Sequence, residues 1–97
     1  MRIISRKAFR TYWEKHPEAE PSLSDFYRKL KWLEAYSLIE VRQTFPGTDN
    51  VGDCSVFNVG GNKYRVIVHL DFEVQTAWIR FVLSHAEYDN DRWKTDC

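Results

Sequence analysis

The sequence predicts one α+β domain over residues 1–97, with two to three helices packed on a small antiparallel sheet that a short N-terminal strand joins. Three observations lead to this prediction. A chain of 97 residues has room for a single hydrophobic core. Its first half repeats apolar residues every three to four positions, as amphipathic helices do. From Cys54 onward the repeat shortens to two, which is typical of strands.

The N-terminal elements follow from short local patterns. Arg2-Ile3-Ile4 is an apolar, β-branched run that is long enough for one strand. Ser5 is expected to cap a helix that runs to about His16, because a serine hydroxyl can accept a free N–H of the first turn. The apolar stripe of that helix consists of Phe9, Tyr12, Trp13 and His16.

Two more helices are expected before the sheet. One runs from Glu18 or Ser22 to Ala35, and its buried face consists of Leu23, Phe26, Leu30 and Leu33. Ser37 and Glu40 match a capping box, which predicts a short third helix. Residues 46–53 follow as a turn-rich surface loop.

The rest of the chain predicts a three-stranded meander. Its strands are expected at Ser55–Val59, Asn62–Asp71 and Thr76–Ser84, with Gly60-Gly61 as a two-residue hairpin turn. The segment from His85 to Cys97 is polar apart from Tyr88 and Trp93, and no further element is predicted there.

Composition excludes several classes of protein. Lys plus Arg equals Asp plus Glu at 14 each, so bulk charge does not draw the chain to nucleic acid or to a membrane surface. No apolar run approaches the ~20 residues that span a bilayer, and the first residues do not form a signal peptide. A cytoplasmic protein without a membrane partner is therefore expected. Two cysteines are too few for a disulfide framework, and Cys97 is expected to be a free thiol.

Side chains alternate across a strand, so the two faces of the meander can be separated. The set expected to face the helices consists of Tyr64, Val66, Val68, Leu70, Ala77, Ile79, Phe81 and Leu83. If Asp71 pairs with Thr76, Arg65 and Arg80 become diagonal neighbours on the other, outward face. A hairpin closed at Gly60-Gly61 places Asn58 opposite Lys63 on that same face.

Guanidinium groups near an aromatic ring suit a phosphate with an adjacent base, and Trp78 supplies such a ring on the outward face. The faces alone favour an ordinary solvated surface. His85 and Tyr88 change that balance because they follow the strand that carries Arg80. An imidazole, a phenol and two guanidinium groups around one concavity suit acid–base chemistry on a phosphodiester.

These residues lie within a longer motif. It comprises Phe57-Asn58-Val59-Gly60-Gly61-Asn62-Lys63-Tyr64-Arg65-Val66, Trp78-Ile79-Arg80-Phe81-Val82 and Ser84-His85-Ala86-Glu87-Tyr88-Asp89. With this motif the chain resembles the HigB-family toxins of bacterial type II toxin–antitoxin modules, and the resemblance covers nearly its whole length. It implies a RelE/ParE-like fold, mRNA interferase activity, usually on mRNA in the ribosomal A site, and inhibition by a cognate helix-turn-helix antitoxin.

The resemblance also implies roles for single residues. Arg65 and Arg80 match arginines that hold and neutralise the scissile phosphate. His85 and Tyr88 match positions that act as general base or acid. Asn58 and Lys63 lie within the motif and are expected, with Trp78, to contact RNA; Asp89 lies there without an assigned role. Many relatives are basic whereas this chain is neutral, which bears on ribosome docking rather than on the chemistry.

The expected reaction is metal-independent cleavage of mRNA by its own 2′-hydroxyl. Either His85 or Tyr88 could take the 2′-proton, and the residues leave this choice open. His16, His69 and His85 lack metal-ligand spacing, so no metal or cofactor is expected. His16 is expected to pack at a helix end, and Arg6, Lys7 and Arg10 to form a solvated helix face.

Two alternative functions remain at this point. A toxin of the same fold could inhibit DNA gyrase, as ParE-type toxins do, although His85 and Tyr88 argue against this. The chain could also be a non-catalytic RNA-binding module.

Overall fold

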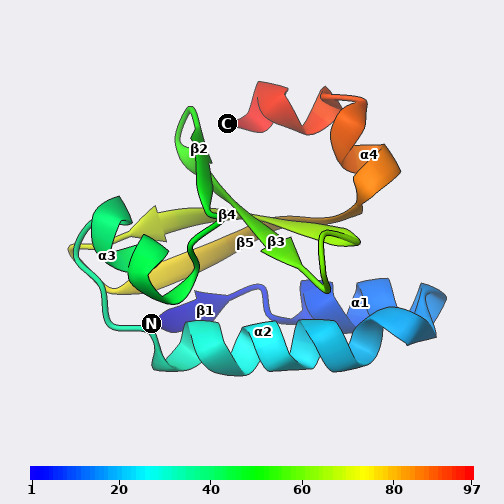
Figure 1. The fold of residues 1–97 in the computed structure, drawn as a ribbon, viewed down its shortest axis with the longest axis horizontal. Coiled ribbons are helices and arrows are strands. Elements are labelled where there is room, and N and C mark those ends of the chain that lie inside the picture. The colour runs from blue at the N-terminus through cyan, green and yellow to red at the C-terminus, as the bar shows by residue number, and fades with distance from the viewer.

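The sheet has the strand order β1-β5-β4-β3-β2 in the computed structural model, which describes residues 1–97 (Figure 1). Its strands are β1 (Arg2–Ile4), β2 (Asp49–Val51), β3 (Cys54–Val59), β4 (Tyr64–Asp71) and β5 (Thr76–Ser84). The α-helices are α1 (Lys7–Lys15), α2 (Glu20–Trp32), α3 (Leu38–Thr44) and α4 (His85–Asp89), with 3-10 turns η1 (Pro17–Ala19) and η2 (Arg92–Asp96). Strand β1 runs parallel to β5, and all other neighbours are antiparallel. The predicted α+β class and N-terminal edge strand are confirmed.

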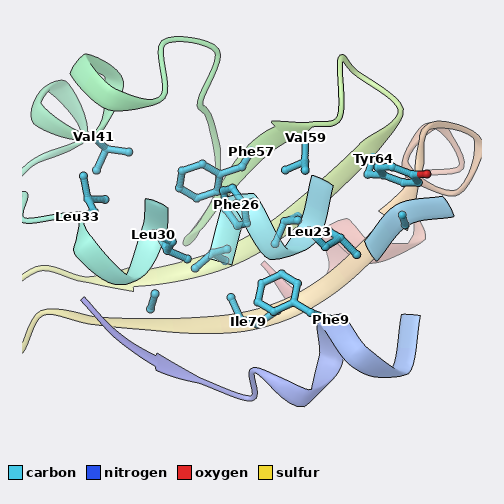
Figure 2. Close-up of a cluster of buried hydrophobic side chains, with 14 of the residues drawn as sticks. Phe9, Leu23, Phe26, Leu30, Leu33, Val41, Phe57, Val59, Tyr64 and Ile79 are labelled. Atoms are coloured by element: carbon cyan, nitrogen blue, oxygen red, sulfur yellow. The ribbon is translucent and has the colours of Figure 1, made fainter. Parts of the chain in front are cut away.

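Helices α1 and α2 pack side by side on one face of the sheet and enclose the main core (Figure 2). Phe9, Leu23, Phe26 and Leu30 from the helices meet Phe57, Val59, Tyr64 and Ile79 from the strands. The Phe26 and Phe57 rings lie 5.1 Å apart between centroids. Burial of each such side chain stabilises the fold by about 1.5–3 kcal/mol, so this face fixes how the sheet is oriented.

The caps of two helices differ from the prediction. Ser5 does not cap α1. Its φ is +69°, Arg6 occupies the N-cap position instead, and no side chain accepts an N–H of the first turn. Ser37 does cap α3, since its hydroxyl accepts the Glu40 N–H at 3.2 Å. The Glu40 carboxylate accepts the N–H of Tyr36 instead of Ser37, so the predicted capping box is only half formed.

The β3–β4 hairpin is longer than predicted. Gly60, Gly61 and Asn62 all have positive φ, at 65°, 61° and 72°, and the loop extends over Gly60–Lys63. Three successive left-handed residues cannot form a two-residue turn, and the last strand pair is Val59 with Tyr64. Asn58 therefore lies opposite Arg65 and not opposite Lys63, which corrects the predicted register.

Strand β5 contains a bulge that the sequence did not predict. Asp71 pairs with Thr76, as expected, but Val68 pairs with Ile79 and Ile67 with Phe81, so Arg80 is an extra residue without a partner. The side chains after Arg80 consequently change faces. Val82, and not Phe81 or Leu83, packs in the core under the helices, so that part of the predicted face assignment was wrong.

The outward face of the sheet is covered by the C-terminal segment, which lies on the side opposite to α1 and α2 (Figure 1). A second buried cluster there consists of Cys54, Val56, Ile67 and Trp93, with Phe81, Leu83 and Tyr88 packed against it. Cys54 and Cys97 form a disulfide with a Cα–Cα distance of 5.4 Å, so the expectation of a free Cys97 thiol was wrong. The Asp53 N–H also donates to the Cys97 carbonyl at 3.0 Å, which holds the chain end on the β2–β3 turn.

Strand β2 lies in the segment that was predicted as a loop. Asp49, Asn50 and Val51 pair with Val56, Ser55 and Cys54, respectively. The three residues lack strand alternation, and the free edge of β3 supplies the hydrogen bonds that make them a strand. No helix of the structure has the length and apolar character needed to cross a membrane.

Candidate functional site

Helix α4 places the predicted acid–base residues directly after the last strand. Ser84 accepts the Glu87 N–H at 3.2 Å, and the Glu87 carboxylate accepts the Ser84 N–H at 2.8 Å, so a complete capping box starts the helix. His85 and Tyr88 then stand three residues apart and lie near the same side of one turn. The N–H of His85 also donates to the Lys63 carbonyl at 3.1 Å, which ties α4 to the β3–β4 loop.

The His85 imidazole is paired with a carboxylate. Its Nδ1 lies 2.9 Å from Oδ2 of Asp89, and both side chains are more than half exposed. A carboxylate that accepts the Nδ1 proton fixes the tautomer and leaves Nε2 available for proton exchange. The pair can therefore work as a general base or, when protonated, as a general acid.

Arg65 reaches the same helix from β4. Its guanidinium lies 5.3 Å from the centre of the Tyr88 ring, and its Nη1 donates to the carbonyls of Asn62 and Tyr64 at 2.8 and 3.2 Å. The remaining N–H groups of the guanidinium have no hydrogen-bond partner in the protein, which leaves a fork suited to phosphate oxygens. The Tyr88 ring stacks on Trp93 at 5.0 Å and 18°, and the Trp93 indole donates to the Tyr88 carbonyl.

We call Arg65, His85, Tyr88 and Asp89 the α4 site. Asn58 borders it because this exposed residue is the strand partner of Arg65, and its Nδ2 donates to the Gly47 carbonyl at 3.4 Å. Lys63 borders it through its contact with His85, and its side chain is exposed.

Arg80 and Trp78 lie away from the α4 site. The predicted diagonal contact of Arg65 and Arg80 does not form, because Arg65 pairs with Leu83, three residues beyond Arg80, or roughly 10 Å along the strand. Arg80 instead lines a hollow of about 560 Å³ between β5 and α1. A second hollow of about 450 Å³ contains Arg80 together with Trp78 and His69, which are strand partners. His69 is half-buried, and its Nδ1 lies 2.9 Å from the Asp53 carbonyl oxygen.

Several residues of these sites were missed from the sequence. Asp89 had no assigned role, although its position four residues after His85 is the spacing that allows a helical pair. The Ser84-x-x-Glu87 pattern was a visible signal for α4. Tyr12 and His16 line the α1–β5 hollow with Arg80, and no local pattern relates residues so far apart in the chain. No group of three or more His, Cys, Asp or Glu side chains is arranged to hold a metal ion.

Comparison with known proteins identifies the family. A model described as HigB_toxin, the RelE-like toxic component of a toxin-antitoxin system, matches residues 19–91. The chain belongs to the HigB toxin family. The matched segment includes the α4 site, Arg80, Trp78, Asn58 and Lys63.

Individual HigB proteins are similar over most of their length. The mRNA interferase HigB of Escherichia coli O6:H1 (strain CFT073) is 34% identical over 92 residues, which cover 92% of this chain and 89% of that protein. The mRNA interferase toxin HigB of E. coli K12 is 34% identical over 100 residues, with 92% and 88% covered, and HigB of Shigella flexneri matches equally. The helices and mixed sheet are compatible with the RelE-like fold of the HigB family.

Proposed function

We propose that this chain is the mRNA interferase toxin of a type II toxin–antitoxin system and that it inhibits translation by cleaving mRNA in the ribosome. Its family and the names of its relatives support this function. The structural observation that carries the proposal is the contact of Arg65 with Tyr88, on the same short helix as the His85–Asp89 pair.

The α4 site has the groups that an attack by the RNA's own 2′-hydroxyl needs. A base takes the 2′-proton, the 2′-oxygen bonds to phosphorus, and the bond from phosphorus to the 5′-oxygen breaks. The departing 5′-oxygen takes a proton from an acid, which gives a 2′,3′-cyclic phosphate and a 5′-hydroxyl. All proton transfers in this scheme use protein side chains.

Each group of the α4 site has a role in this scheme. Arg65 would stabilise the charge that builds up on the phosphate oxygens. His85, oriented by Asp89, and Tyr88 would supply the base and the acid, and either residue can take either role. Arg80, Trp78, Asn58 and Lys63 would contact the RNA outside the reacting bond.

Family membership implies an antitoxin partner. We propose that this antitoxin is a small helix-turn-helix protein encoded next to the toxin, and that both act in the cytoplasm. Co-expression should abolish the toxicity of the chain.

The function is tested by brief expression of the chain in bacteria, followed by primer extension on abundant mRNAs. Cuts in the reading frame at ribosome-occupied codons, with 5′-hydroxyl ends, are expected for the wild type. Arg65→Ala should lower the cleavage rate about 10²–10³-fold and His85→Ala about 10²–10⁴-fold. Arg28→Ala and Tyr36→Phe change exposed residues outside the α4 site and should leave cleavage unchanged.

Other outcomes would point to the alternative functions. DNA breaks that depend on gyrase, without mRNA cuts, would replace the proposal by gyrase inhibition. RNA binding without any cleavage would indicate a non-catalytic module.

A further inference from the structure

The edge of β5 is flanked by two hollows that the α4 site does not use. Strand β1 ends at Ile4 and pairs with β5 only as far as Trp78, so the edge is open from Arg80 onward. The two hollows described above share the lining residues Ser5, Ile79 and Arg80, so they lie next to each other at this edge. Their volumes of about 560 and 450 Å³ fall within the usual range for ligand pockets. We call the two adjacent hollows together the β5-edge groove.

The charge of the β5-edge groove is positive although the chain is neutral. Lys7, Lys15 and Arg80 line it, and none of them forms an ion pair with a carboxylate. Glu87 is the one carboxylate in the lining, and it accepts the Ser84 N–H at the start of α4. Unpaired cations in a hollow attract an anionic ligand more strongly than the same charges on a flat surface do.

Aromatic rings lie on both sides of Arg80. The rings of Tyr12 and His16 pack against each other on α1, with centroids 4.5 Å apart and planes tilted by 30°, and both line the larger hollow. The Tyr12 ring also makes an edge-to-face contact with the Tyr64 ring, with 5.9 Å between their centroids. Trp78 lines the smaller hollow and is 43% exposed. His16 lies at the C-terminal end of α1 and packs against Tyr12, as expected for a helix-end residue, and its side chain is about half exposed in this groove.

We propose that the β5-edge groove binds single-stranded RNA, with a phosphate on Arg80, one base against the Tyr12–His16 ring pair and another against Trp78. This inference rests on the proposed function, because it assigns the groove to the same RNA that the α4 site cleaves. Cations alternating with exposed ring faces are the arrangement by which proteins hold single strands without reading their sequence. An acidic peptide would use the cations but would leave both aromatic platforms without a ligand.

The test uses a labelled RNA hexanucleotide with 2′-O-methyl groups, which cannot be cleaved by 2′-attack, so that the wild-type chain binds it unchanged. Fluorescence anisotropy gives the affinity. Tyr12→Ala, His16→Ala and Trp78→Ala should each weaken binding about tenfold, whereas Tyr12→Phe should keep it, because the ring face is retained. Arg80→Ala should lower the slope of log affinity against log salt by about 0.7, which corresponds to one lost phosphate contact on a single strand.

Matched controls lie on exposed surface outside the groove. Trp32→Ala and Arg28→Ala remove an exposed indole and an exposed guanidinium and should leave the affinity unchanged. Tyr12 also packs against the main core, so His16→Ala, at an exposed position, keeps the test valid if Tyr12→Ala unfolds the chain.

The outcomes separate this inference from the proposed function. Unchanged RNA affinity in the groove variants would overturn the proposal that the groove binds RNA. The proposed function would still stand if the wild type cleaves mRNA and Arg65→Ala does not. Absent cleavage by the wild type, together with weakened binding in the groove variants, would overturn the proposed function alone. Stronger binding of a labelled polyglutamate peptide than of RNA would assign the groove to an acidic protein segment instead and would overturn the inference.

Discussion

Nδ1 of His85 lies 2.9 Å from Oδ2 of Asp89, one helical turn further along α4. Their exposure, at 57% and 60% of the side chains, limits what the charge interaction contributes, since exposed pairs are worth up to about 1 kcal/mol. The role of Asp89 that follows from the geometry is to orient the imidazole.

The first prediction concerns this pair. Asp89→Asn should slow mRNA cleavage by at most about fivefold, because only the exposed charge interaction is removed. His85→Ala should slow it about 10²–10⁴-fold. Single-turnover cleavage of ribosome-bound mRNA measures both rates. Equal losses in the two variants would mean that the carboxylate itself reacts with the substrate.

The second prediction concerns the disulfide. It closes a loop with a sequence separation of 43 residues, and Cys97→Ser should lower the free energy of unfolding by about 4 kcal/mol through the greater freedom of the unfolded chain. Urea unfolding with and without a reductant measures the change. Reductant should bring the wild type to the stability of Cys97→Ser and should leave the variant unaffected. A wild type insensitive to complete reduction would contradict this prediction.

The third prediction concerns Gly52, at the turn between β2 and β3. Its φ is +57°, and a Cβ there would collide with the Cys97 carbonyl. Gly61 has a similar φ of +61° with open space around it, so Gly61→Ala measures the backbone cost alone, about 1–2 kcal/mol. Gly52→Ala should lower the free energy of unfolding by clearly more than Gly61→Ala in urea titrations. Equal losses of stability in the two variants would show that the Cys97 carbonyl does not pack closely against Gly52.

The fourth prediction concerns Tyr12 and pH. Burial, followed by the charge of Glu87, raises the pKa of Tyr12 above its usual value of 10. The neutral phenol thus favours folding fully below pH 10, and this stability is lost as the pH rises through the folded-state pKa. The Tyr12 hydroxyl has no hydrogen-bond partner in the protein, so Tyr12→Phe should have little effect below pH 10. Above that pH, urea unfolding of Tyr12→Phe should show a smaller loss of stability than the wild type, and identical losses would contradict the prediction.

The main elements could be predicted because their signals are local. Apolar residues three or four apart gave α1 and α2, and alternation gave β3 to β5. Strand β2 could not be predicted, since Asp49-Asn50-Val51 has turn composition and becomes a strand only beside β3. The disulfide could not be predicted either, because nothing in the sequence brings Cys54 near Cys97 until the sheet and η2 have formed.

The candidate site was predicted in part. The motif pointed to Arg65, His85 and Tyr88, and the structure places Arg65 against Tyr88 with His85 on the same short helix. Arg80 was placed beside Arg65 by counting residues from the Asp71–Thr76 pair, and the unpredicted bulge makes that count fail by one. Tyr12 packs against the core, as its stripe predicted, but the periodicity of a helix cannot show that β1 stops short and leaves a hollow lined by Tyr12 and His16.

The bulge at Arg80 determines which face of the sheet each later side chain of β5 points to. If Arg80 paired with Ile67 in a regular ladder, Phe81 and Leu83 would turn toward α1 and α2, and their contacts with the Trp93 cluster would be lost. The direction in which α4 leaves the sheet depends on the same bulge, because the helix starts directly where β5 ends. A single backbone irregularity in mid-strand thus decides on which side of the sheet His85 and Tyr88 lie, and related proteins without the bulge would need one residue fewer between the last strand arginine and the histidine to keep that side.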